Sequence, residues 1–129
     1  MLDIKTMGPR ALAFILSEQE GVGEISREVV TILSGAGVLD PGTVLGQVTA
    51  SKKYIPSPNA QVVGREGAET ASAILAYGVD ATSADVEAVV IKRIAAVKKP
   101  MLIYDASVND DTKKAAKLAQ LAAVDIIAR

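Results

Sequence analysis

The chain has 129 residues, a length that fits one domain with a modest apolar core. It contains neither Cys nor His, which excludes disulfides and thiol nucleophiles and removes the commonest general base and neutral metal ligand. The formal net charge is −1, the charges are dispersed, and one Phe and three Tyr are the only aromatic residues. We therefore expect no nucleic-acid partner, no stacking platform for sugars, no metal and no cofactor.

The N-terminal 26 residues differ in the composition and order of their segments from the rest of the chain. A short polar lead is followed by an apolar cluster and then by a link rich in Glu and Gly. We interpret residues 1–26 as a flexible arm and linker, and residues 27–129 as the folded domain. The apolar cluster either folds back onto the core of that domain or orders against a partner. Its members are Ala11, Leu12, Ala13, Phe14, Ile15 and Leu16.

This cluster is the longest early apolar run, and it is too short to span a bilayer. It also falls short of the core of a signal peptide, and acidic and polar residues follow it where a cleavage site needs small ones. We therefore expect a protein that is cytoplasmic at synthesis and has no membrane partner.

From residue 28 onward the pattern becomes that of β-structure. Residues 29–33 are rich in β-branched side chains, which strands prefer. Gly46, inside the second expected strand, indicates a bulge or a close backbone approach. The further strands are expected at residues 43–49, 53–55, 71–77, 86–96 and 101–104, with turns at 56–59 and 78–83.

The spacing of apolar residues changes near the C-terminus from that of strands to that of a helix. Residues 109–112 offer several side chains that could cap the start of this helix. Residues 124–127 are expected to form a final strand or an extended tail. The predicted fold class is α+β and β-rich: a small mixed β domain with one late helix. One stripe of that helix is apolar, at Ala115, Leu118, Ala119, Leu121 and Ala122. Its polar residues lie mostly away from the stripe, at Lys113, Lys114, Lys117 and Gln120.

The glycine-rich stretch at residues 34–46 could bind phosphate or only turn the backbone. A P-loop fails here because Thr43 stands where the loop needs a Lys. Asp40 occupies the third position of the dinucleotide-binding pattern, where its charge would repel a pyrophosphate. Residues 40–43 instead predict a type II turn, with Pro41 at its second position and Gly42 at its third, where positive φ is required.

Acidic side chains form two further kinds of group. The cluster near the predicted helix does not match an EF-hand loop, and helix capping explains it more simply. Two carboxylate pairs close in sequence are open to acid–base chemistry, but such pairs are also common on solvated surfaces, and we expect no enzyme. The cluster is Asp105, Asn109, Asp110 and Asp111; the pairs are Glu66 with Glu69 and Asp80 with Asp85.

An ordered series of segments resembles the head decoration proteins of tailed bacteriophages, the family of the lambda capsid decoration protein D. No single segment is chemically distinctive, and the order of the series carries the resemblance. The segments are residues 26–31, 35–37, 42–49, 53–54, 73–75, 79–82, 89–91 and 110–114.

The resemblance implies a homotrimer that sits at three-fold sites on the outer surface of the virion capsid. Such a protein would bind the major capsid protein, stabilise the expanded shell, and be present in the host cytoplasm during assembly. It would also pair its N-terminal arm with capsid strands, which makes residues 11–16 candidate contacts with the capsid or between subunits. The alternative from another class is a small-molecule or glycan-binding β-domain that acts as an accessory subunit.

Overall fold

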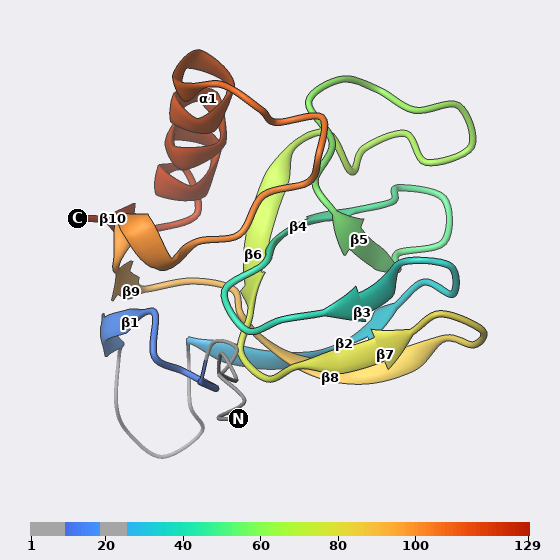
Figure 1. Cartoon of the computed structure of the whole chain (residues 1–129), viewed down its shortest axis with the longest axis horizontal. Coiled ribbons are helices and arrows are strands. Elements are labelled where there is room, and N and C mark those ends of the chain that lie inside the picture. The colour runs from blue at the N-terminus through green and yellow to red at the C-terminus, as the bar shows by residue number, and fades with distance from the viewer. Residues whose placement is uncertain (1–9, 19–25) are drawn as a thin grey trace, which may run out of the picture.

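The computed structural model describes residues 10–18 and 26–129, and the remaining parts of the predicted arm and linker lie outside the described residues. The described part contains ten strands, one 3₁₀ helix and one α-helix, which confirms a β-rich fold with one late helix (Figure 1). No helix in these two ranges is long and apolar enough to cross a membrane. The strands are β1 (Ile15–Glu18), β2 (Arg27–Ile32), β3 (Gly37–Leu39), β4 (Val44–Gln47), β5 (Tyr54–Pro56), β6 (Ala71–Leu75), β7 (Val79–Ala81), β8 (Val86–Ile91), β9 (Ala95–Val97) and β10 (Ile126–Ala128); the 3₁₀ helix is η1 (Lys99–Met101) and the α-helix is α1 (Asp111–Ala122).

Five strands form a closed barrel in the order β2-β5-β4-β6-β8. The longest pairing is the antiparallel one between β2 and β8, which runs from Arg27 opposite Ile91 to Ile32 opposite Val86. The barrel closes through one parallel pairing, between Ile32 and Tyr54. Alternate side chains of these strands point inward and are buried. The interior of the barrel contains Ile32, Leu45, Tyr54, Ala73, Leu75, Ala88 and Val90.

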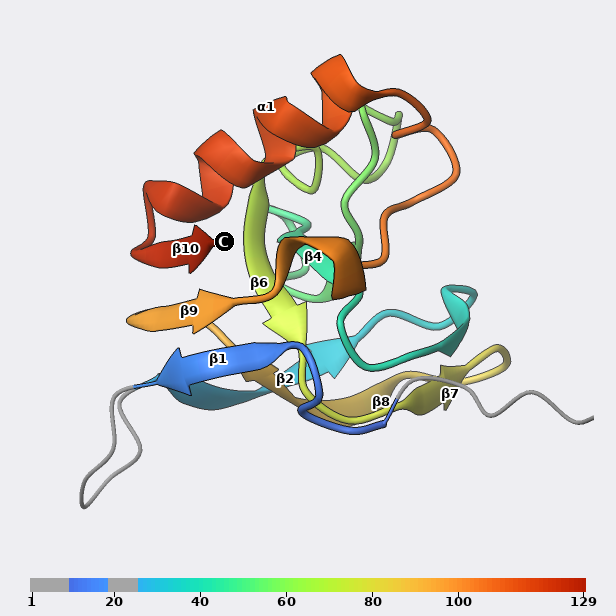
Figure 2. The same cartoon turned by 60° about the vertical axis from the view of Figure 1, so that its left-hand side comes forward.

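Outside the barrel lies a three-stranded sheet in the order β1-β9-β10 (Figure 2). Its central strand, β9, pairs antiparallel with β1 and parallel with β10. A second apolar core fills the space between this sheet, α1 and the outer face of the barrel. Its largest members are Phe14, Ile74, Ile91, Leu121 and Ile126. The short strands β3 and β7 form a separate antiparallel pair.

Two local predictions around the glycine-rich stretch are confirmed. Gly42 has φ 96°, and the Thr43 amide donates to the Asp40 carbonyl at 3.3 Å, as a type II turn requires. The pairing of β4 with β6 shifts register between Leu45 and Gly46, which is the expected irregularity. The backbone of Ala68 also lies so close to Gly46 that a side chain would not fit.

Three predictions in the second half of the chain are wrong. Residues 86–96 form two strands, because the chain turns away from the barrel at Ile94, whose φ is 51°. Residues 101–104 form no strand: η1 occupies 99–101, and Ile103 makes only an isolated bridge with Thr43. Residues 78–83 do not form only a turn, because β7 lies within them and pairs with β3.

The burial of α1 follows the predicted apolar stripe only in part: Leu121 is buried and Leu118 is half-buried against the second core. Lys117 and Leu121 are its buried residues, whereas Ala115, Ala119 and Ala122 are exposed. Lys117 is only 2% exposed, and its ammonium lies among oxygen acceptors of the loop between β5 and β6. Alanine offers little apolar surface to bury, so the acceptors available to Lys117 decide which face of the helix turns inward.

Replacing Gly46 with Ala should destabilise the barrel severely. A Cβ at this position would lie 1.9 Å from the Ala68 carbonyl oxygen, so one of two backbones must move. We expect Gly46→Ala to lower the free energy of unfolding by about 3 kcal/mol or more, measured by urea denaturation. The matched control is Gly35→Ala, where φ is 90° but no atom lies within 4 Å of the added Cβ. That variant should lose only about 1 kcal/mol, and equal losses would contradict the steric explanation.

Candidate functional site

The described part of the N-terminal segment, residues 10–18, packs against the domain. It begins with a tight turn, in which the Ala13 amide donates to the Arg10 carbonyl at 3.2 Å and the Ile15 amide to the Leu12 carbonyl at 3.1 Å. Leu12 adopts φ 64° within this turn, and its amide donates to the Ala76 carbonyl at 3.2 Å. The turn thus fixes the segment to the end of β6 before β1 begins.

Phe14 is the residue that anchors this segment. It is 2% exposed and belongs to the core cluster between the barrel and α1. Its carbonyl accepts a hydrogen bond of 2.6 Å from the Lys98 amide. Of the two interpretations of the apolar cluster, the structure therefore places Phe14 in the core of its own domain. Of the other predicted contact residues, Leu12, Ala13 and Ile15 are half-buried, and Ala11 and Leu16 are exposed.

β1 is an edge strand of the three-stranded sheet (Figure 2). One side pairs with β9, with a register shift between Ile15 and Ser17, and no other described strand pairs with β1. Leu16 lies at this shift and is 49% exposed, and Ile127 on the other edge strand is similarly exposed. An edge strand offers its outer main-chain donors and acceptors to a strand of another chain.

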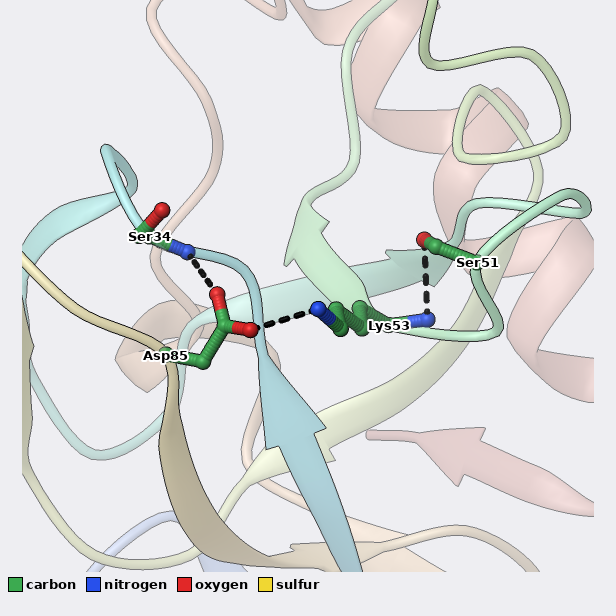
Figure 3. A network of polar contacts seen from close by, with 4 residues as sticks. All are labelled: Ser34, Ser51, Lys53 and Asp85. Atoms are coloured by element: carbon green, nitrogen blue, oxygen red, sulfur yellow. Dashed lines mark hydrogen bonds and ion pairs between the residues drawn. The ribbon is translucent and has the colours of Figure 1, made fainter.

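A network of polar contacts joins three loops at the end of the barrel shown on the right in Figure 1. The Asp85 carboxylate accepts from the Lys53 ammonium at 2.5 Å and from the Ser34 amide at 2.8 Å (Figure 3). The Lys53 amide in turn donates to the Ser51 hydroxyl at 3.3 Å. The contacts with Lys53 and Ser34 lower the pKa of Asp85. The network therefore holds these loops together.

The carboxylates of the two predicted pairs are each hydrogen-bonded to groups of nearby loops. Glu66 accepts from the Gly64 amide and Glu69 from the Gly67 amide, so each carboxylate stabilises the loop that carries it. Asp80 accepts from Thr82 in the same way, which lowers the pKa of Asp80. In the described ranges, no group of three or more acidic residues could hold a metal ion.

The acidic cluster near α1 has the expected structural role. Asp110 is the N-cap of α1 and accepts from the Lys113 amide at 2.8 Å. Asp105 accepts from the amide and the hydroxyl of Ser107, which closes the turn that leads toward the helix. Helix capping and turn formation therefore account for these carboxylates.

A pocket of about 400 Å³ lies between η1 and α1. Its charged groups are Lys99, Asp111 and Lys114, and the Lys114 ammonium lies 5.5 Å from the centre of the Tyr104 ring. Burial raises the pKa of the Tyr104 phenol. The pocket is the place where the small-molecule alternative would be tested, because apolar and charged side chains line it together.

Truncating Phe14 should destabilise the whole domain. Phe14→Ala removes a buried ring from the second core, and we expect a loss of about 3–5 kcal/mol in the free energy of unfolding. Leu16→Ala, two residues away and half exposed, should change it by less than about 0.5 kcal/mol. Thermal or urea denaturation checks both values. A Phe14 variant as stable as wild type would show that residues 10–18 are not part of the folding unit.

The family model described as "Bacteriophage lambda head decoration protein D" matches residues 4–126, which is nearly the whole chain. No curated protein matches the chain. The family match supports a role in capsid decoration, with the phage capsid as binding partner and the virion as location, and it favours a structural over a catalytic protein. The chain therefore belongs to the family of the bacteriophage lambda head decoration protein D.

Proposed function

We propose that the protein cements the phage head as a homotrimer at three-fold sites, where it binds the major capsid protein and stabilises the expanded shell. The observation that carries this proposal, beside the family match, is the edge strand β1, which pairs with β9 on one side only among the described strands. A capsid strand added to β1 would gain main-chain hydrogen bonds along the edge, and exposed side chains would select the fit.

The six candidate contact residues differ in how they can act in this proposal. Phe14 lies in the core and cannot contact the capsid in this conformation, so it acts by holding β1 in place. Leu16 and Ala11 are exposed and remain the candidates for direct contact. Because β1 is already ordered on β9, a capsid strand would bind a preformed edge, which reduces the entropy cost of association.

Trimerisation would multiply the strength of this edge contact. A trimer offers three copies of β1 to subunits around one three-fold site, and linked contacts raise the overall affinity far above that of one contact. The same geometry bridges neighbouring capsid subunits, which resists their separation. The protein would meet the capsid in the host cytoplasm during assembly and remain on the outer surface of the virion.

A charge at the exposed position of β1 should weaken capsid binding. Leu16→Asp places a carboxylate beside the edge, where it opposes the addition of another strand. We expect at least about tenfold weaker binding to expanded shells that lack the decoration protein, measured by co-sedimentation. A point variant is the right test, because deleting residues 1–20 would also remove Phe14 from the core.

The matched control is Val38→Asp, which adds the same charge at an exposed valine of β3. This variant should bind shells as wild type does. If Leu16→Asp also bound normally, while circular dichroism showed both variants folded, the edge-strand part of the proposal would fail and the family assignment would stand.

The mass of the protein tests the proposed oligomer. Light scattering after size-exclusion chromatography should give three times the mass of the 13.4 kDa chain. If the protein trimerises only on the capsid, chemical cross-linking on expanded shells should give a species of that same mass. A single-chain mass in solution together with isolated, uncross-linked copies on shells would contradict the homotrimer.

A further inference from the structure

We propose that the outer face of the three-stranded sheet β1-β9-β10 contacts the capsid, and that it accepts a segment of the major capsid protein with an apolar and an acidic side chain. This inference rests on the proposed function, because it adds a second surface to the same contact with the shell. The observations that carry it are a row of apolar side chains across the sheet, two cations on the same face, and the continuity of the row with the edge of β1.

The register of β9 with β10 divides the side chains of the sheet between two faces. Ala95 lies opposite Ile126, and both belong to the second core. Because side chains alternate between faces along a strand, the next pair, Ala96 and Ile127, points away from that core. The exposure of β10 agrees with this division, since Ile127 is 44% exposed and Ile126 is fully buried.

The register shift in β1 adds Leu16 to the outer face. The pairing of β1 with β9 skips Leu16, because the pairs before and after it involve Ile15 and Ser17. Ser17 lies opposite Ala96, and in a β-bulge two residues of one strand oppose a single residue of the partner strand. Leu16 therefore lies beside Ala96, and its exposure of 49% fits this placement. The result is an apolar row with one residue from each strand: Leu16, Ala96 and Ile127.

Two cations, Lys98 and Arg129, continue the outer face beyond this row. The backbone stays extended at Lys98, with φ −84° and ψ 111°. The Arg129 amide donates to the Val97 carbonyl at 2.9 Å, so the pairing of the two strands reaches past β10. Each cation lies two residues after a member of the row, and alternation therefore places both on the outer face. Neither of them forms an ion pair with a residue that the structure describes.

The outer face thus offers an apolar surface with positive charge at one end. An apolar side chain of a partner would remove the row from water, and a carboxylate would pair with one of the cations. Both groups fit on one extended segment, because side chains two residues apart in a strand point to the same side. The partner chemistry we assign is therefore an extended segment with an apolar residue and an acidic residue two positions apart.

The occupant of this face is the capsid rather than a second copy of the chain. A row of three side chains is far smaller than the roughly 20–30 residues on each side of a stable interface, so it belongs to a larger contact. The proposed strand-binding edge of β1 adjoins it, and a strand added there would place alternate side chains beside Leu16 on the outer face. Packing of the face on the same face of a second copy would give a two-fold dimer and not the proposed three-fold ring.

Shell binding by a variant of β10 tests the face separately from the β1 edge. Ile127→Asp places a carboxylate in the apolar row without changing β1. We expect it to bind expanded shells that lack the decoration protein at least about tenfold more weakly than wild type in co-sedimentation. The matched control is again Val38→Asp, which adds the same charge at an exposed residue of β3 and should bind as wild type does. Circular dichroism and the thermal midpoint check that both variants fold.

Reversal of a charge at the basic end gives a second test that leaves the apolar row intact and decides the question if Ile127→Asp does not fold. Arg129→Glu should weaken shell binding at least about threefold at low salt, and added salt should reduce this difference because ions screen exposed charges. The control is Lys52→Glu, the same change of charge at an exposed residue between β4 and β5, on the side of the molecule away from the sheet (Figure 1). This control should bind as wild type does at every salt concentration.

The outcomes separate this contact from the proposed function. If Ile127→Asp and Arg129→Glu bound shells as wild type does while Leu16→Asp bound more weakly, the outer face would not contact the capsid, and the proposed function would stand. If Ile127→Asp converted a trimer to single chains in light scattering, the face would be a subunit contact and the inference would be wrong. If wild type did not bind expanded shells, the proposed function and this contact would both fail.

Discussion

The break between β8 and β9 is the constraint on which the rest of the structure depends. Ile94 adopts a left-handed backbone conformation, with φ 51°, that a branched residue takes only at a cost. The Ala95 amide then donates a hydrogen bond to the Asp125 carbonyl at 3.1 Å. Without this turn, residues 95–97 would extend β8 along the barrel, and no central strand would exist for β1 and β10. One three-residue strand therefore positions both edge strands, including the proposed capsid-binding edge.

Features that depend on a few adjacent residues could be predicted from the sequence. The turn at residues 40–43 follows from the fixed φ of Pro41 and the positive φ available to Gly42. The start of α1 follows from the ability of Asp110 to accept from the first free amides of a helix. The irregularity at Gly46 could be anticipated as well, although its cause, the Ala68 backbone, lies far along the chain.

Features that depend on contacts between distant residues could not be predicted in this way. The run from 86 to 96 is mostly apolar, and its charged residues, Glu87, Lys92 and Arg93, fit an exposed strand face as well as a turn, so the composition does not mark Ile94 as the point where the chain leaves the barrel. The helical pattern places Lys117 on the solvent side of α1. The three oxygen atoms that accept from its ammonium lie about fifty to sixty residues earlier in the chain, and the spacing of apolar residues within a helix carries no information about them. The location of Phe14 was open for the same reason, since its core is built from β6, β9 and α1.

The candidate site has a physical character that sequence motifs do not record. An edge strand binds through main-chain groups that every residue possesses, so no pattern of side chains marks it in the sequence. The carboxylates that a search for catalysis would select, Asp85 among them, are instead engaged with loop backbone and a neighbouring lysine. What distinguishes this edge is its support from below: Phe14, next to β1, is buried in the core of the domain. For the proposed cementing role, the side chains of greatest consequence are thus the buried ones that keep a simple contact surface in shape.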